Sequence, residues 1–292
     1  VLVSYSKAAL KEQLVDAEMQ PDVCLSGALQ QAFPERLVEL YPAEVQEHRL
    51  HREIVATQIA NDIVNRMGLN FIPRQQSATG ASVADVACAY AAVMDVYRIP
   101  ELWERIENVN HAVTAQDQMD MMLALVSLVK RATRWLLRNR RRQLAPGPLI
   151  AQFGAGVERL PAVLPSLLRG RTAKHYEDLR TLYANMGVDS ALADAVACTH
   201  YSYTALGIIE AATEAQAPPI DVARMYFALG EQLQLDWFAS QILATKVDSE
   251  WQSMARDTYL EDLEWQQRTL AIGALRHLDA NRDLEDALQR WV

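Results

Sequence analysis

The sequence predicts an all-α protein, an irregular bundle of many helices. Apolar residues recur at spacings of three and four along almost all of the 292 residues. No run of alternating β-branched residues bounded by turn residues appears, so no strand is expected. Half of the residues are hydrophobic and 22% are charged, a composition that supports a buried core and argues against intrinsic disorder.

Proline, glycine and capping residues divide the N-terminal half into helices. Pro42 precedes a long helix, and Gly68 stands where a left-handed cap would end it. Residues 69–81 are the best loop candidate. Ser82 opens the next helix, with Asp85 at a capping-box spacing. The helices expected in this half are residues 4–19, 25–33, 51–68 with the segment after Pro42, 82–97, 100–110 and 114–142.

The segment Ala-Pro-Gly-Pro at residues 145–148 is expected to interrupt the helices, because proline lacks the N–H that a helix interior needs. It predicts a boundary between two packed helical halves, residues 1–145 and 146–292, although one large domain also agrees with the length. The helices expected in the second half are residues 149–168, 172–187, 189–198, 202–216, 220–234, 236–246 and 249–278.

The charge balance argues against nucleic acid and membrane partners. A net charge of −9 opposes a surface that neutralises many phosphates. The basic run at residues 138–142 ends a predicted helix, where cations complement the helix dipole. Trp251, Trp265 and Trp291 are expected to anchor a core or an interface rather than to stack on bases. The longest uncharged stretch, residues 195–209, is shorter than the roughly 18 residues that a membrane span needs.

The three cysteines, Cys24, Cys88 and Cys198, lie far apart in apolar or small-residue surroundings. Such surroundings are typical of buried free thiols, and three thiols cannot all pair with one another. We therefore expect a reducing, cytoplasmic setting.

The residue patterns of known catalytic and metal sites are missing. No histidine has a glutamate three residues before it, as a di-iron bundle requires. His48 and His51 could supply half a metal site, but Glu44 and Glu47 complete no ligand pattern. Gly154-Ala-Gly156 lacks both the third glycine and the strand of a dinucleotide site, so a flexible or close-packing position in a helix is favoured. We predict no catalytic, cofactor-binding or metal-binding residue in this chain.

The helix at residues 51–68 has an unusual polar side. One arc is an apolar, core-facing stripe, while the opposite arc carries Leu50 and Ile54 among short amides, with Asp62 and Arg66 as a neighbouring ion pair. Either a second helical layer or a neighbouring domain covers this arc, or it is a solvated polar face. The hypothesised docking face consists of Arg52, Glu53, Thr57, Gln58, Asn61 and Asn65.

Several stretches, taken in order, resemble the C-terminal region of the large bacterial NAD-specific glutamate dehydrogenases. They are SYSKAALKEQLVDAEM, HRLHREIVATQIANDIVNRMG, SVADVACAYAAVMDVYRIPELWERIE, KRATRWLLRNR and MYFALGEQLQLDWF. The resemblance implies a cytoplasmic, allosterically controlled parent enzyme that uses NAD to convert L-glutamate to 2-oxoglutarate and ammonia. In that family the dinucleotide-binding and glutamate-binding parts precede this region, so no catalytic residue is carried over.

The resemblance implies a non-catalytic helical domain that docks on the catalytic domain of the same chain or on a neighbouring subunit of a homo-oligomer. The chain begins at Val1, without an initiator Met, so we expect it to be part of a longer polypeptide. Two alternatives remain open at this point, a free-standing helical scaffold for protein partners and a helical-bundle enzyme of another kind.

Overall fold

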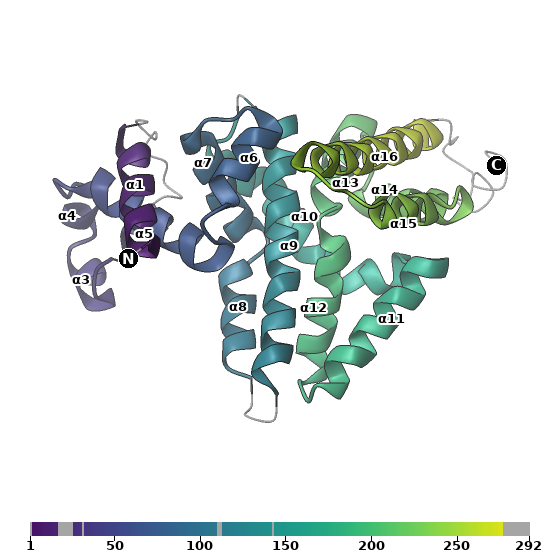
Figure 1. Cartoon of the computed structure of the whole chain (residues 1–292), viewed down its shortest axis with the longest axis horizontal. Helices are drawn as coiled ribbons and strands as arrows, with labels where there is room; N and C mark the ends of the chain where they lie inside the picture. The colour runs from purple at the N-terminus through teal and green to yellow at the C-terminus, as the bar shows by residue number, and fades with distance from the viewer. Residues whose placement is uncertain (1, 17–25, 31, 110–112, 142, 277–292) are drawn as a thin grey trace. The chain divides into compact units, whose positions relative to one another are not determined.

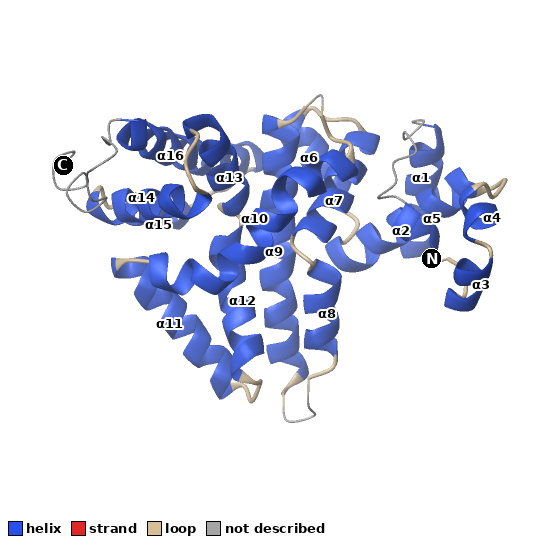
Figure 2. Ribbon diagram, turned by 180° about the vertical axis from the view of Figure 1, so that it is seen from behind, coloured by secondary structure: helices blue, strands red, loops and turns tan. Residues whose placement is uncertain are grey.

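The computed structural model describes residues 2–16, 26–30, 32–109, 113–141 and 143–276. Every regular element in these residues is helical and none is a strand, which confirms the predicted all-α class. Figure 2 shows these helices in blue, joined by tan loops. In the described ranges no single helix is long and apolar enough to cross a membrane, and only α6 (Phe71–Thr79) with α7 (Val83–Val96), bent by 108°, passes as a pair on length and composition.

The helices form two compact units, each described by itself below. Unit 1 contains the described residues of Val1–Arg105 and Met122–Ala155, and unit 2 those of Ile106–Met121 and Gly156–Val292. The borders between the units fall inside α8 (Ile99–Glu107), α9 (Ala115–Asn139) and α10 (Pro146–Leu167). The Pro-Gly-Pro segment therefore lies in the first turn of α10, where proline is tolerated. The division into halves at residues 145 and 146 stays a prediction.

The N-terminal part of unit 1 is built around α5 (His51–Asp62), against which α1 (Leu2–Asp16) packs (Figure 1). A π-helical turn, Ile63–Met67, extends α5 to Gly68, whose φ of 80° suits glycine. Pro42 begins a separate short helix rather than the long one that the sequence predicted. The short helices of this part are α2 (Ser26–Gln30), α3 (Glu35–Leu40) and α4 (Pro42–Gln46).

The loop predicted at residues 69–81 is wrong, because most of it forms α6. Pro73 lies in the first turn of this helix, where a backbone N–H would have no helical partner. Gly80 adopts a left-handed conformation with φ of 71°, and its N–H donates to the Gln76 carbonyl oxygen at 2.7 Å. The ring of Phe71 meets that of Tyr90 edge-on, 5.7 Å between centroids, and so packs α6 against α7.

The start of α7 is the capping box that the sequence predicted. The Asp85 N–H donates to the Ser82 hydroxyl at 3.1 Å, and the Ser82 N–H donates to the Asp85 carboxylate at 3.2 Å. These two bonds satisfy N–H groups that a helix end otherwise leaves without partners. Val86, Tyr90 and Val93 are buried on one side of the helix, as their spacing indicates.

Unit 2 is an assembly of helices in which α16 (Glu250–Arg276) lies against three others. Arg268 Nη1 and Glu210 Oε2 form an ion pair at 2.9 Å, and Gln267 Nε2 donates to the Tyr226 carbonyl oxygen at 2.8 Å. Gly230 allows this approach, because a Cβ there would lie 2.5 Å from Gln267 Nε2. The other helices of this unit are α11 (Gly170–Asn185), α12 (Ser190–Ser202), α13 (Ala205–Ala215), α14 (Pro219–Gln232) and α15 (Leu235–Ala244).

Gly156 marks a close contact between α10 and α13. A Cβ at this position would lie 2.6 Å from Ile209 Cδ1 and 2.9 Å from Ile209 Cγ1. The close-packing role that the sequence favoured for the Gly-Ala-Gly segment is therefore confirmed for Gly156. At Gly154 the added atom would meet only Ile150 of the same helix, at an ordinary 3.7 Å.

Each unit has an apolar interior of its own. Burying a Leu, Ile, Val or Phe side chain contributes about 1.5–3 kcal/mol by removing apolar surface from water. Representative core residues of unit 1 are Val55, Ile59, Ile63, Ile72, Val86, Val93, Leu125, Val129 and Phe153; those of unit 2 are Leu164, Leu192, Val196, Leu206, Ile208, Val222, Met225 and Ile272.

Candidate functional site

The docking face predicted on α5 is only partly covered within the described residues. Glu53, Thr57, Gln58 and Asn61 are half-buried, while Arg52 and Asn65 are exposed. Leu50, at the start of the same arc, is 47% exposed. Asn65 falls inside the π-helical turn, which shifts its position around the axis relative to a regular α-helix. Docking of this face on another domain stays a prediction.

Two residues of that face already have bonds within unit 1. Arg52 Nη2 donates to the Val15 carbonyl oxygen at 3.0 Å, in the last turn of α1. A cation there satisfies a carbonyl that the helix end leaves free and complements the helix dipole. The Thr57 hydroxyl donates to the Glu53 carbonyl oxygen at 2.6 Å, one turn back along α5. Arg52 therefore joins α5 to α1, whereas the bond of Thr57 stays within α5.

The ion pair predicted beside this face is confirmed and extends into a network with α7 and α8. Arg66 Nε and Asp62 Oδ1 are 2.6 Å apart, and the Tyr90 hydroxyl donates to Asp62 Oδ2 at 2.6 Å. The Arg66 guanidinium lies over the Trp103 ring, 5.0 Å from its centroid. Burial, and next the Asp62 carboxylate, raise the pKa of Tyr90 well above its usual value, so its hydroxyl remains a donor.

The basic run at the end of α9 caps another helix. Arg138 Nη2 donates to the Ala78 carbonyl oxygen at 3.2 Å, and Arg141 Nη2 donates to that of Thr79 at 3.1 Å. Both carbonyls belong to the last turn of α6, where cations also favour the dipole. This role could not be predicted while residues 69–81 were expected to form a loop. Beside the cap is a hollow of about 120 Å³ lined by Thr79, Gly80, Ala81, Asp85, Leu137, Arg141 and Leu144.

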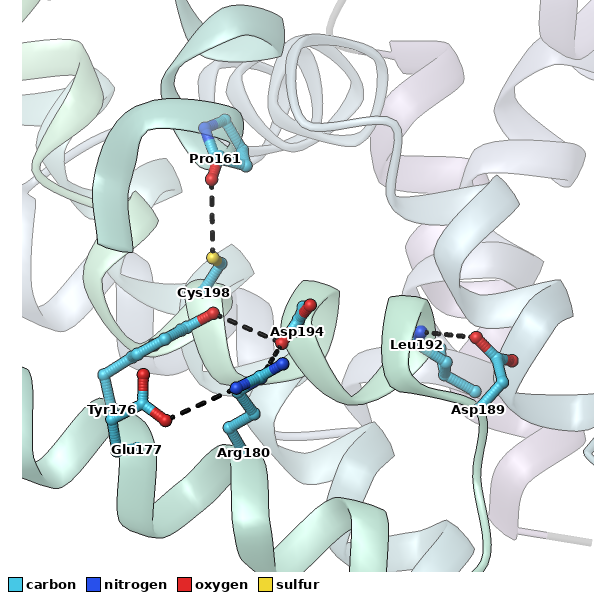
Figure 3. A network of polar contacts seen from close by, with 8 residues as sticks. All are labelled: Pro161, Tyr176, Glu177, Arg180, Asp189, Leu192, Asp194 and Cys198. Carbon is cyan, nitrogen blue, oxygen red and sulfur yellow. Dashed lines mark hydrogen bonds and ion pairs between the residues drawn. The ribbon is translucent and has the colours of Figure 1, made fainter. Parts of the chain in front are cut away.

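A polar network joins α11 to α12 in unit 2 (Figure 3). Arg180 pairs with Asp194 across the two helices and with Glu177 one turn back on α11. The Tyr176 hydroxyl also donates to the Asp194 carboxylate, at 3.4 Å. The Asp194 carboxylate therefore accepts hydrogen bonds from a charged donor, Arg180, and from a neutral one, Tyr176. The signal in the sequence was the i, i+4 spacing of Tyr176 with Arg180, which places both on one side of α11.

Cys198 occupies the same interface and donates its thiol proton to the Pro161 carbonyl oxygen, at 3.7 Å (Figure 3). In a regular helix that carbonyl would accept the N–H of residue 165, but α10 has Pro165 there. The proline thus frees an acceptor inside unit 2, and the thiol satisfies it. Neither Cys198 nor Cys88 forms a disulfide; Cys198 is buried, as predicted, whereas Cys88 is half-buried, and Cys24 lies outside the described residues.

Histidines and tyrosines extend the interface between α11 and α12. The Tyr201 hydroxyl donates to the Thr172 carbonyl oxygen at 3.0 Å and lies 2.7 Å from His175 Nδ1. A carbonyl oxygen can only accept, so the Tyr201 hydroxyl donates its proton to the Thr172 carbonyl. The same hydroxyl oxygen then accepts the proton on His175 Nδ1. Tyr183 and His200 share a further hydrogen bond of 3.3 Å. Burial is the largest cause that raises the pKa of Tyr201 and of Tyr183, so both phenols stay neutral at pH 7.

This network positions two helices, and its buried groups are poorly suited to nucleophilic chemistry. Burial raises the pKa of the Cys198 thiol to about 11; the Tyr176 hydroxyl opposes the shift and the Asp194 carboxylate adds to it. A thiol reacts as its thiolate, so this one is largely inert near neutral pH. In the part of the chain that the structure describes, no group of three His, Cys, Asp or Glu residues could hold a metal ion.

We expect Cys198 to resist alkylation by iodoacetamide at pH 8 while Cys88 is modified, with peptide mass spectrometry as the measurement.

The Cys198 thiol contributes to stability as long as it is protonated. This contribution is fully present below pH 9.0, the usual pKa of a thiol, and is lost as the pH rises to about 11. A Cys198→Ser variant should lose less stability than wild type over that interval. Equal alkylation of both cysteines in the folded protein would contradict the assignment.

His48 has a local structural role before α5. The Leu50 N–H donates to His48 Nδ1 at 3.1 Å, just before α5 begins. The Phe33 ring lies 5.6 Å from the His48 ring. This imidazole therefore caps the turn that leads into α5.

Unit 2 carries an exposed apolar surface on α15 and α16, which we call the aromatic surface. Trp251 is 79% exposed, Tyr259 65% and Trp265 57%. Of the two roles expected for Trp251 and Trp265, a place in a core is wrong and a place in an interface stays a prediction; Trp291 lies outside the described residues. The aromatic surface consists of Trp237, Phe238 and Leu243 of α15 with Trp251, Tyr259 and Trp265 of α16.

Comparison with known proteins matches the whole chain to one family. The family model "Glutamate dehydrogenase, C-terminal" covers residues 1–292. The chain is 40% identical over its full length to an NAD-specific glutamate dehydrogenase of Pseudomonas aeruginosa and 37% identical to one of Halomonas elongata. A Mycobacterium tuberculosis protein of the same description is 29% identical over 99% of the chain. The chain spans 18% of the length of each of these relatives.

Proposed function

Because the chain belongs to the family of glutamate dehydrogenase C-terminal regions, we propose that it is a non-catalytic docking and assembly domain of an NAD-dependent enzyme of that kind. The parent reaction is the oxidative deamination of L-glutamate by NAD and water, which yields 2-oxoglutarate, ammonia and NADH. The catalytic and NAD-binding residues belong, in this proposal, to the rest of the polypeptide. The parent is a cytoplasmic homo-oligomer, and this chain contacts the catalytic part or a neighbouring subunit.

The observation that carries the proposal is the aromatic surface. Soluble domains seldom leave several large apolar side chains together in water, because the exposed area promotes association. Tryptophan and tyrosine are also enriched among the residues that contribute most to protein interfaces. A domain that represents 18% of its relatives' length and carries such a surface is well suited to contact the remainder of the polypeptide.

The test compares the full polypeptide with a form that lacks this chain and with this chain alone. We expect the chain alone to produce no NADH from glutamate and NAD. Its deletion should change the oligomeric state measured by light scattering, or the glutamate-dependent rate. NADH production by the chain alone at a rate near that of the full polypeptide would refute the proposal. Deletion that leaves both assembly and rate unchanged would refute it as well.

A further inference from the structure

We propose that the aromatic surface of α15 and α16 is the docking site, and that its occupant is an apolar surface edged by Lys and Arg in the part of the polypeptide outside this chain. The inference rests on the proposed function and names the partner's chemistry. It places the docking site on unit 2, whereas the sequence predicted it on the polar face of α5.

Helix α15 has an apolar composition but no buried residue. Its sequence, LDWFASQILA, contains two large aromatic and three branched aliphatic side chains. Trp237 and Phe238 contact each other edge-on, 5.0 Å between ring centroids, and both remain exposed. A solvated amphipathic helix would bury its apolar stripe. The contacts of α15 with the rest of unit 2 do not bury its apolar side chains, which therefore remain in solvent.

The aromatic residues of α16 share one side of that helix. At about 100° per residue, Trp251, Tyr259 and Trp265 fall within an arc of about 120°. Between the two tryptophans the same arc also carries exposed Ala255 and Asp262 and half-buried Thr258, so its large side chains are aromatic and one carboxylate lies among them. The opposite side of α16 carries Gln267 and the buried Ala271, and the bonds of Gln267 and Arg268 join the helix to α14 and α13. The helix therefore has one side bound to its own unit and an aromatic side left open.

Helices α15 and α16, each of which leaves large apolar side chains exposed, are neighbours in unit 2. Only residues 245–249 separate α15 from α16, and the helices pack together, as Figures 1 and 2 both show. Leu243 is the last residue but one of α15 and Trp251 the second residue of α16. From there the aromatic side chains of α16 continue for about 21 Å to Trp265, at 1.5 Å per residue.

The charges around the aromatic surface favour a basic partner over a second copy of this chain. From Glu231 to Arg276 the sequence has eight acidic and four basic residues, a net charge of −4. Two of the four cations are already paired within unit 2, Arg268 with Glu210 and Arg276 with Glu214. Asp248 and Asp262 are exposed beside the aromatic side chains. Two copies would bring like charges together, whereas Lys and Arg on a different surface would complement them.

Hydroxyl-radical footprinting of aromatic side chains, read by peptide mass spectrometry, tests the proposal. Oxidation of Trp251 and Trp265 should be about fivefold slower in the full polypeptide than in this chain alone, because the centre of an interface excludes water. The paired substitutions Asp248→Lys and Asp262→Lys in the full polypeptide should restore most of the oxidation, since they place cations opposite cations. Glu104→Lys with Asp178→Lys, an equal charge change at exposed sites elsewhere, should leave the protection intact.

The outcomes separate this inference from the proposed function. Equal oxidation of both tryptophans in the two proteins would overturn the inference, while an effect of deleting the chain on assembly would still support the proposed function. Protection in this chain alone would overturn it too. If light scattering then shows a dimer that Trp251→Asp disrupts, the occupant is a second copy. If the protected chain is a monomer, its own residues cover the surface.

Discussion

Replacing Gly156 with valine is expected to lower the free energy of unfolding by about 3 kcal/mol, the upper range for overpacking a close contact. The first added carbon alone would lie 2.6 Å from Ile209 Cδ1, and Ile209 is itself buried. Because both helices are held by other contacts, neither can retreat without opening space elsewhere. Urea unfolding followed by circular dichroism measures the effect as a lower midpoint.

The neighbouring glycine supplies the matched control. Gly154→Ala adds a carbon that meets only Ile150 Cγ2 at 3.7 Å, so it should stabilise the helix by up to about 1 kcal/mol through higher helix propensity. Shortening the opposing side chain with Ile209→Val should recover part of the loss in a Gly156→Ala protein. A Gly156→Val protein as stable as wild type would show that α10 and α13 do not meet at this point.

Replacing Asp62 with alanine is expected to lower the free energy of unfolding by about 2 kcal/mol. The substitution leaves the buried Tyr90 hydroxyl and the half-buried Arg66 guanidinium without their shared acceptor. Tyr90→Phe removes only one of these bonds and should cost about 1 kcal/mol. A double-mutant cycle of the two substitutions, measured by urea unfolding, isolates the bond between Asp62 and Tyr90. If Asp62→Ala lowers the free energy of unfolding no more than Tyr90→Phe does, the ion pair of Asp62 with Arg66 does not contribute to stability.

Local signals were sufficient to predict much of the fold. The capping box of α7 and the first-turn proline of α8 are properties of neighbouring residues, so their helices could be located from the sequence. For α6 the same kind of evidence misled, because Pro73 and Gly80 are typical of loops. Each is compatible with a helix at the place it occupies, the first turn and the C-terminal cap. Whether these two residues indicate a loop or the ends of a helix depends on where the helix begins. The spacing of apolar residues alone did not locate that start.

The contacts that join helices could not be predicted from one sequence. The ion pair of Asp62 with Arg66 was predicted because the two residues are four apart, whereas the bond from Tyr90 spans 28 positions. In the same way the basic run was recognised as a helix end, but its carbonyl partners lie about 60 residues earlier. The aromatic surface was missed because a tryptophan at helical spacing has the same pattern whether it faces a core or solvent.

Because Pro165 cannot donate an N–H to the Pro161 carbonyl, the residue types tolerated at positions 165 and 198 depend on each other. With proline at 165, the Pro161 carbonyl needs a side-chain proton, and alanine or valine at 198 would leave a lone pair without one. With any other residue at 165, the main chain supplies that proton and the thiol becomes dispensable. Two positions on different helices, neither of them near a reacting group in this structure, are thus under a joint constraint during evolution.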